Sequence, residues 1–157
     1  MAKVEEIDRH NYTYSFINLT ASVGRHGINN KNDVMVVQAL CNYGLSTNGD
    51  FAGKLPQPTG AMDRNTRSFI KKLQHHLKKL KAGGITIDGR IDRAKGQFVE
   101  GKKSIWTIIH LNDLAQERWL FCGSRNNNYI EDMCFHYPQL VSIIKNNRFG
   151  TLDLPIE

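Results

Sequence analysis

The sequence contains no apolar run as long as the roughly 18 residues that cross a membrane. Its opening residues, MAKVEEIDRHNYTY, also lack the apolar core of a secretory signal. We therefore expect no membrane insertion and no signal peptide. The expected location is the cytoplasm, or the cell envelope after export by a non-classical secretion system.

Cysteine is scarce as well. The chain has three, Cys41, Cys122 and Cys134, an odd number without Cys-x-x-Cys spacing, which argues against a disulfide framework and favours reduced thiols. Cys122, Cys134 and His136 would give zinc three ligands, but a structural zinc site needs a fourth and the spacing fits no usual pattern. Core cysteines are the favoured interpretation, and we expect no metal and no cofactor.

Paired catalytic groups are also lacking. Glu131 and Asp132 are adjacent, so their carboxylates diverge on any regular element and do not make the pair that a glycosidase needs. His75 and His76 point about 100° apart on a helix, which disfavours a shared metal ion and favours solvated side chains. A Cys/His hydrolase built on Cys122 is the minor alternative, although nothing in the local sequence LFCGS lowers the pKa of that thiol. We expect no catalytic residues.

Positive charge is abundant. The 157 residues carry a formal net charge of +6, which favours anionic partners such as nucleic acid, anionic lipid or an acidic cell-wall polymer. Much of this charge lies on the back of a helix predicted over residues 64–81. No nucleic-acid recognition motif accompanies it and no aromatic residues are interleaved for base stacking, so we interpret it as a solvated face and expect no nucleic-acid partner.

The first helix is predicted over Lys31 to Tyr43. Asn30 is the expected N-cap, Asp33 stands in the first turn, and Gly44 ends the helix. Apolar residues occupy several of its sides, which predicts a central helix. The Gly- and Pro-rich loop that follows is expected to contain no regular element.

Four further elements are predicted. The segment NYTYSFINLT alternates aromatic and polar residues, which is typical of a short half-buried strand. A helix over 64–81 ends at the Gly83-Gly84 pair, a third covers about 104–116, and a short one covers 138–146 after Pro138. The apolar residues expected to be buried in the second and third helices are Phe69, Ile70, Leu73, Leu77, Leu80, Ile105, Trp106, Ile108, Ile109, Leu111 and Leu114.

A short pattern of Gly, any residue, a long apolar residue and Asp occurs twice, in TGAMD at 59–63 and in ITIDGRID at 85–92. Both copies predict the same turn. The Gly allows a positive φ, Met62 or Ile91 anchors the loop in the core, and the Asp caps the backbone N–H groups that follow.

The order helix, Gly-x-apolar-Asp loop, helix, Asp-Gly-x-apolar-Asp loop, helix resembles the three-helix peptidoglycan-binding domain of many bacterial and phage cell-wall hydrolases. The resemblance covers roughly residues 22–116. In two places the chain departs from that family: Asp63 stands where a second Gly is usual, and RAKGQFVEGKK is inserted before the third helix. The opening SVGRHGINNKNDV also resembles a variant associated with type VI secretion. The segments that carry the resemblance are NDVMVVQALCN, GAMDRNT, FIKKLQ, IDGRID and IWTIIHLN.

The resemblance implies a mainly α fold, a three-helix bundle of the peptidoglycan-binding type at 22–116, with an N-terminal extension at 1–21 and a C-terminal extension at 117–157 that packs on it. It implies non-catalytic binding of peptidoglycan or a cell-wall-like ligand, in a groove between the first two helices and the Asp-Gly loops. The residues that it places at this groove are Asp63, Thr66, Gln74, Asp88 and Trp106. The alternative is a protein-interaction adaptor, effector or accessory module of a secretion system, with a secretion-system protein as its partner.

Overall fold

The computed structural model describes residues 2–9, 12–80, 84–95, 106–123 and 125–144. They form a mainly helical protein with a few short strands, as the sequence predicts. In chain order the elements are β1 (Lys3–Arg9), β2 (Tyr12–Asn18), β3 (Val23–Gly24), α1 (Lys31–Gly44), the 3-10 helix η1 (Gly49–Phe51), α2 (Arg64–Lys79), β4 (Arg90–Ile91), α3 (Thr107–Cys122), α4 (Tyr129–His136) and α5 (Gln139–Ile144).

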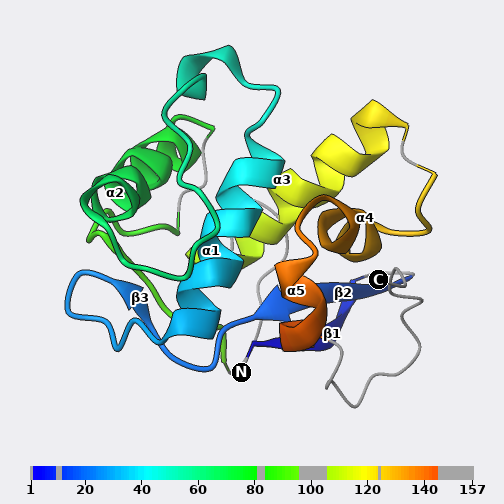
Figure 1. The fold of residues 1–157 in the computed structure, drawn as a ribbon, viewed down its shortest axis with the longest axis horizontal. Coiled ribbons are helices and arrows are strands. Elements are labelled where there is room, and N and C mark those ends of the chain that lie inside the picture. The colour runs from blue at the N-terminus through cyan, green and yellow to red at the C-terminus, as the bar shows by residue number, and fades with distance from the viewer. Residues whose placement is uncertain (1, 10–11, 81–83, 96–105, 124, 145–157) are drawn as a thin grey trace.

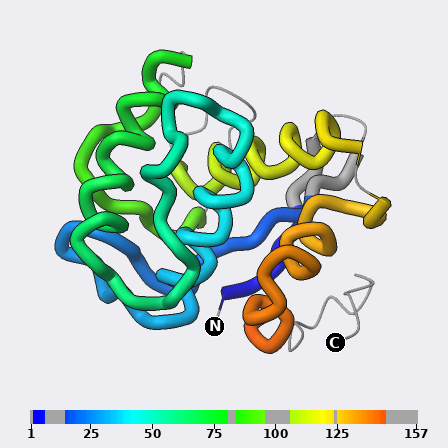
Figure 2. Tube along the Cα trace, turned by 45° about the horizontal axis from the view of Figure 1, so that its top comes forward, coloured from blue at the N-terminus to red at the C-terminus, as the bar shows by residue number. Residues whose placement is uncertain are grey.

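Helix α1 lies at the centre of the molecule, as its apolar residues predict. Figure 1 shows α2 on one side of it, α4 and α5 on the other, and α3 crossing behind it, and Figure 2 keeps the same arrangement from a tilted view. The β3–β4 pair packs against α2, whereas the antiparallel β1–β2 hairpin contacts α3. No helix in the described ranges is both long enough and apolar enough to cross a membrane.

The N-terminal end of α1 is fixed by two polar side chains. Asn30 is the N-cap, as predicted, and its Oδ1 accepts the Asp33 N–H at 2.9 Å. Asp33 does more than favour the helix dipole, because its side chain is fully buried. Its carboxylate accepts the backbone N–H groups of Thr20 and Ala21, both at 3.0 Å, and the Thr20 hydroxyl at 2.7 Å. Asp33 therefore ties the segment after β2 to the start of α1.

The predicted N-terminal strand is β2, and the burial of its residues 15–18 does not alternate as expected. It pairs with a second strand, β1, that the sequence analysis did not predict, and both Phe16 and Ile17 are fully buried. Asn112 of α3 satisfies the buried backbone groups at this end. Its side chain accepts the Ile17 N–H at 2.8 Å and donates to the Ile17 carbonyl at 3.0 Å, so it pairs with the edge of β2 as a strand would.

The ends of α2 and α3 differ from the prediction. α2 stops at Lys79, before the Gly pair, because the Leu80 N–H is shared by the carbonyls of His76 and Leu77 in a tightened last turn. Leu80 is consequently 44% exposed and not part of the buried stripe. α3 begins after Trp106, its N-cap residue.

The far end of α3 lies six residues beyond the predicted Gln116. The helix continues to Cys122 and ends where Gly123 takes the left-handed conformation with φ 62°. Ile105 and Gly83, which the sequence analysis placed in or beside helices, lie outside the described residues.

Two short helices were missed. η1 interrupts the loop after α1, with Asn48 as its N-cap. α4 begins at the N-cap Asn128, whose side chain accepts the Glu131 N–H at 2.9 Å. The spacing of Asn128 and Glu131 matches that of a capping box, and it was the available signal. α5 covers most of the predicted C-terminal helix, and its apolar residues Leu140, Val141, Ile143 and Ile144 are buried as expected.

One hydrophobic cluster includes residues from all three predicted segments, 1–21, 22–116 and 117–157. β1 and β2 contribute Val4, Phe16 and Ile17, and α4 and α5 join the same cluster as α1. A buried hydrogen bond of 2.5 Å from the Tyr43 hydroxyl to Asp132 fastens α4 to α1. The boundaries of the three segments stay a prediction.

Substitution of Asp33 tests its role in joining the segment after β2 to the start of α1. Asp33→Ala leaves the Thr20 and Ala21 N–H groups buried without their acceptor, so we expect the free energy of unfolding to fall by about 3 kcal/mol. Asp50→Ala is the control, because Asp50 is exposed, and it should change stability by no more than about 0.5 kcal/mol. Urea denaturation followed by circular dichroism measures both. Equal losses in the two variants would show that Asp33 has no such role.

Candidate functional site

A buried glutamine amide in α1 holds the first of the two repeated loops. The Gln38 Oε1 accepts the Thr59 N–H at 3.0 Å and the Gly60 N–H at 2.8 Å. Its Nε2 donates to the Ala61 carbonyl at 2.8 Å and to the Thr66 hydroxyl at 3.0 Å. One side chain thus satisfies the backbone of the loop and joins it to the first turn of α2.

Gln74 in α2 holds the second loop in the same way. Its Oε1 accepts the Asp88 N–H at 3.2 Å and the Gly89 N–H at 2.8 Å. Its Nε2 donates to the Arg90 carbonyl at 2.9 Å and to the Thr107 hydroxyl at 3.5 Å, and it also reaches the Asp88 Oδ1 at 3.1 Å. The two loops therefore share one geometry, in which Gln, Gly and Thr occupy corresponding places.

The predicted turn chemistry is confirmed at both glycines, since Gly60 has φ 83° and Gly89 has φ 74°. It is also confirmed at Asp63, the N-cap of α2, whose Oδ1 accepts the Thr66 N–H at 2.7 Å. Hydrogen bonds from Thr66 lower the pKa of this carboxyl. The expected cap is wrong for Asp92, which forms an ion pair with Arg90 at 3.0 Å because no helix follows it directly.

The second loop borders a small cavity with a volume of about 280 Å³, which we call the Trp pocket. Its walls come from α2, from the loop around β4 and from the start of α3. Most of the lining groups are polar, and one is the half-buried indole of Trp106. The lining residues are Gln74, Gly84, Thr86, Asp88, Arg90, Asp92, Trp106 and Thr107.

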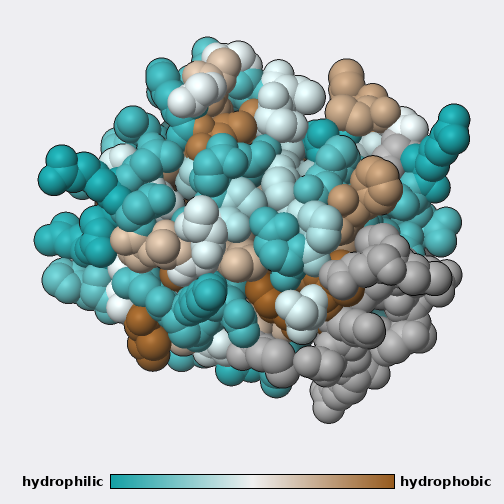
Figure 3. Space-filling model, in the orientation of Figure 1, coloured by the Kyte–Doolittle hydropathy of each residue, from teal (hydrophilic) through white to brown (hydrophobic). Residues whose placement is uncertain are grey.

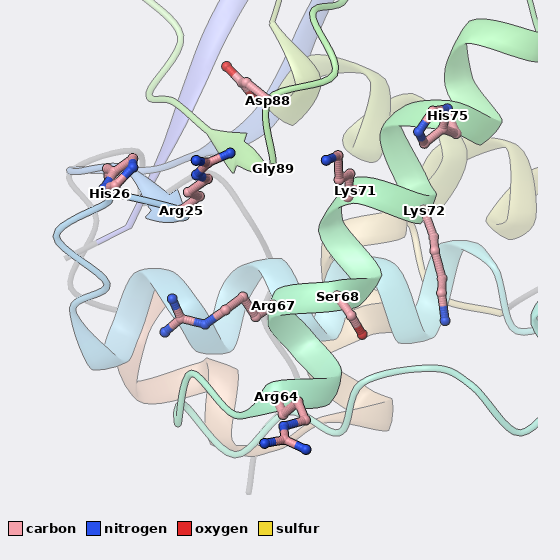
Figure 4. A pocket seen from close by; sticks show the side chains of 10 residues that line it. All are labelled: Arg25, His26, Arg64, Arg67, Ser68, Lys71, Lys72, His75, Asp88 and Gly89. Carbon is pink, nitrogen blue, oxygen red and sulfur yellow. The ribbon is translucent and has the colours of Figure 1, made fainter.

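On the other side of Asp88 lies a larger cavity of about 740 Å³, which we call the basic groove. Figure 4 shows that one wall is the outer face of α2 and the other is formed by the loop after β3 and by Asp88 and Gly89. The side chains of Arg25 and Lys71 point into the space between these walls. The lining residues are Arg25, His26, Arg64, Arg67, Ser68, Lys71, Lys72, His75, Asp88 and Gly89.

The structure brings three of the five predicted site residues together. Gln74, Asp88 and Trp106 line the Trp pocket, and Asp88 also lines the basic groove. Asp63 and Thr66 line neither cavity, because Asp63 caps α2 and Thr66 is buried against Gln38. No described residue of α1 lines either cavity, so both lie elsewhere than the groove expected between the first two helices.

The sequence analysis missed most of the basic groove. It identified the cationic back of α2 but read it as a solvated face, and it did not place Arg25 or His26 opposite that face. The available signal was the loop SVGRHGINN, whose Gly residues permit the turn that carries both side chains. Of the adjacent histidines, His75 is exposed in the groove, as expected. His76 is half-buried edge-on against Phe51, and this burial lowers its pKa.

A buried polar cluster joins α1, α3 and α4. The Asp132 carboxylate accepts the Tyr43 hydroxyl and, at 2.8 Å, the Asn126 side-chain amide. The Arg118 guanidinium lies over the Tyr43 ring at 3.9 Å, and His136 approaches Asp132 at 3.7 Å. Burial and the neighbouring Asp132 raise the pKa of Tyr43. These contacts join side chains of three helices.

The three cysteines are free thiols in the structure. In the described ranges no hydrogen bond joins Cys122 or Cys134 to a histidine, and no group of three or more His, Cys, Asp or Glu residues could hold a metal ion. Burial raises the pKa of Cys134 to about 12. The expectation of core cysteines is confirmed for Cys41 and Cys134 and wrong for Cys122, which is exposed at the end of α3.

Comparison with protein-family models, with curated proteins and with solved structures found no match.

Thiol accessibility tests the placement of the three cysteines. Native protein at pH 8 should react rapidly with Ellman's reagent at one thiol, Cys122, because burial keeps Cys41 and Cys134 protonated and shielded. Three thiols should react in denaturant, and Cys122→Ser should leave none that reacts rapidly in the native state. Rapid reaction of a second native thiol would contradict the placement of the buried pair.

Proposed function

We propose that the protein is a non-catalytic module that binds bacterial peptidoglycan or a cell-wall-like ligand in the Trp pocket. The observation that carries this proposal is the convergence of Gln74, Asp88 and Trp106, which come from α2, the β4 loop and the start of α3, on one cavity. The resemblance to the peptidoglycan-binding domain places the same three residues at the ligand. The proposal also takes α1, α2 and α3 with their two clamped loops as a fold of that type.

The chemistry of the pocket suits part of a glycan or of a short peptide. The indole of Trp106 offers an apolar face, and Thr86, Asp88 and Arg90 offer hydrogen-bond acceptors and donors around it. A volume of about 280 Å³ lies just below the range of roughly 300–1,000 Å³ for pockets that enclose drug-sized ligands. One sugar ring or one peptide residue therefore fits better than a larger ligand, and several such contacts along a polymer would add avidity.

Asp88 is held ready for such a contact. Its Oδ1 accepts the Arg90 N–H at 3.0 Å and the Gln74 amide at 3.1 Å, which fixes the orientation of the carboxylate. The side chain is nevertheless exposed, at the border of the two cavities. A carboxylate held in this way accepts a hydrogen bond from a ligand hydroxyl or amide at little cost in side-chain entropy.

The alternative is an adaptor that binds a secretion-system protein. The observation that favours it is the exposure of large apolar side chains on α3 and α4: Leu120 is 65% exposed, Phe121 95% and Phe135 64%. These residues belong to the predicted C-terminal extension, and exposed apolar groups of this size are typical of protein interfaces.

Sedimentation with isolated peptidoglycan sacculi tests the main proposal. We expect the protein to sediment with sacculi and to stay bound as salt is raised to several hundred millimolar, because a shaped pocket is screened less than net charge. Asp88→Asn should weaken binding about tenfold, since it replaces a charged acceptor while its Oδ1 still accepts from Arg90 and Gln74.

Asp50→Asn is the matched control, because it makes the same change of charge at an exposed site outside the pocket, and it should sediment as wild type. Binding that disappears at moderate salt would reduce the interaction to net charge. Absence of binding at any salt concentration would leave the adaptor function, for which Phe121→Ser and Phe135→Ser are the variants to examine.

The two tryptophans give an independent test. In Trp119→Phe the only remaining indole is Trp106, and we expect its fluorescence to change when a soluble muropeptide is titrated, because the ligand contacts it. Trp106→Phe leaves Trp119, which lies outside the pocket and donates to the Asn126 carbonyl at 3.1 Å, and its emission should not change. A response from Trp119 alone would place the ligand elsewhere.

A further inference from the structure

We propose that the basic groove is a second binding site, for a linear phosphodiester polymer that it holds through the phosphates of the backbone. The groove is separate from the Trp pocket apart from Asp88 at their border. The inference does not depend on peptidoglycan binding, and it differs from the expectation that the basic face of α2 is only solvated.

The charge in the groove is concentrated and uncompensated. Five of its lining residues are Arg or Lys and one is an acid, Asp88. Among the described residues no ion pair joins any of the five to an Asp or Glu. The five residues are Arg25, Arg64, Arg67, Lys71 and Lys72. Like charges that face one cavity repel one another and raise the local concentration of anions, so an anionic ligand relieves a strain that the fold leaves in place.

The spacing of the cationic side chains on α2 favours an extended polymer. Arg64, Arg67, Lys71 and His75 follow one face of the helix at intervals of three and four residues, which correspond to steps of about 4.5–6 Å along the axis. These steps are comparable to the distance between successive phosphates of an extended phosphodiester chain. A single small anion would occupy only part of this row.

The opposite wall is rigid and strained. His26 and Asn29 have φ 58° and 56°, a conformation that side-chain-bearing residues rarely adopt. The Asn29 side chain holds the loop in place, because it accepts the Gly24 N–H at 2.6 Å and donates to the carbonyls of Gly24 and Gly27 at 3.1 and 3.2 Å. The Arg25 N–H donates to the Gly89 carbonyl at 2.9 Å. The backbone of Arg25 and His26 is therefore held across the groove from α2 before any ligand arrives.

The lining residues of the basic groove favour a polymer that is bound through its phosphates. No Trp, Tyr or Phe lines the groove, so bases have no aromatic surface on which to stack. One edge of the neighbouring strand β3 pairs with β4, and the Gly24 N–H and carbonyl are bonded to the Asn29 side chain, which disfavours an acidic peptide that adds as a strand. Three arginines supply planar forks that match phosphate oxygens in pairs.

Figure 3 is consistent with an accessible polar surface, since the side of the molecule where α2 lies in Figure 1 is mainly hydrophilic.

Asp88 is the one lining residue of the basic groove whose charge repels an anion. Its removal should therefore tighten phosphate binding a few-fold, whereas the same change weakens wall binding if the Trp pocket is used as proposed. The opposite signs allow one variant to separate the two sites.

Fluorescence anisotropy with a labelled abasic phosphodiester oligomer of about 20 units tests the proposal. We expect binding whose logarithmic salt slope is near −3, as for about four phosphates. Arg67→Glu should weaken it tenfold or more and make the slope shallower by about one. Arg125→Glu makes the same change at an exposed position between α3 and α4, away from the groove, and should stay within twofold of wild type. Lys71→Glu is a second groove variant, and circular dichroism checks that each variant is folded.

The comparison ligands decide the chemistry and its source. Polyglutamate of equal charge should compete at least tenfold more weakly, and equal competition would overturn the phosphate assignment. Equal losses of affinity in Arg67→Glu and Arg125→Glu would overturn the assignment of binding to the basic groove. Oligothymidylate should bind like the abasic chain, and a tenfold preference for it would overturn binding through the backbone alone. A glycerol-phosphate polymer that binds as well as the abasic chain supports a wall polymer as the source, whereas binding of the deoxyribose-phosphate chains alone supports nucleic acid.

Discussion

The hydrogen bonds of two buried glutamine amides determine where the loops of this protein lie. A glutamine side chain has two acceptor positions and two donor hydrogens, and a buried one is costly unless these are used. Gln38 and Gln74 each use both ends, on two backbone N–H groups of a loop and on a carbonyl and a Thr hydroxyl beside it. Each amide therefore substitutes for the strand or helix partner that a short loop lacks.

This constraint explains why the two cavities adjoin. Gln74 fixes the loop at Asp88 and Gly89, and that loop is at once the edge of the Trp pocket and part of one wall of the basic groove. The hydrogen bonds of the Asn29 side chain to the loop after β3 fix the other part of the same wall. A polar pocket with one indole and a cationic groove thus lie side by side on a surface whose backbone is held by amide side chains.

Local chemistry made much of this fold predictable. Asn30 and Asp63 are caps whose sequence positions announce their roles, and the glycines of the repeated pattern have the positive φ expected of them. What could not be predicted depends on partners distant in the chain. Asn112 pairs with β2 across 95 positions of sequence and Arg25 faces α2 across the groove, and no periodicity signals either. The resemblance alone assigned Asp63 to the site, whereas its sequence position indicated the cap that the structure shows.

The hydrogen bonds of Gln38 and Gln74 also determine how the two loops open. The amide protons of Gly60 and Gly89 are each bonded to a side-chain oxygen, so a single rotation of Gln38 or Gln74 frees them without any helix unwinding. We therefore expect these protons to exchange with solvent by local fluctuation, at a free energy below that of global unfolding. The two loops are bonded to different glutamines, so the opening of one does not require the hydrogen bonds of the other to break.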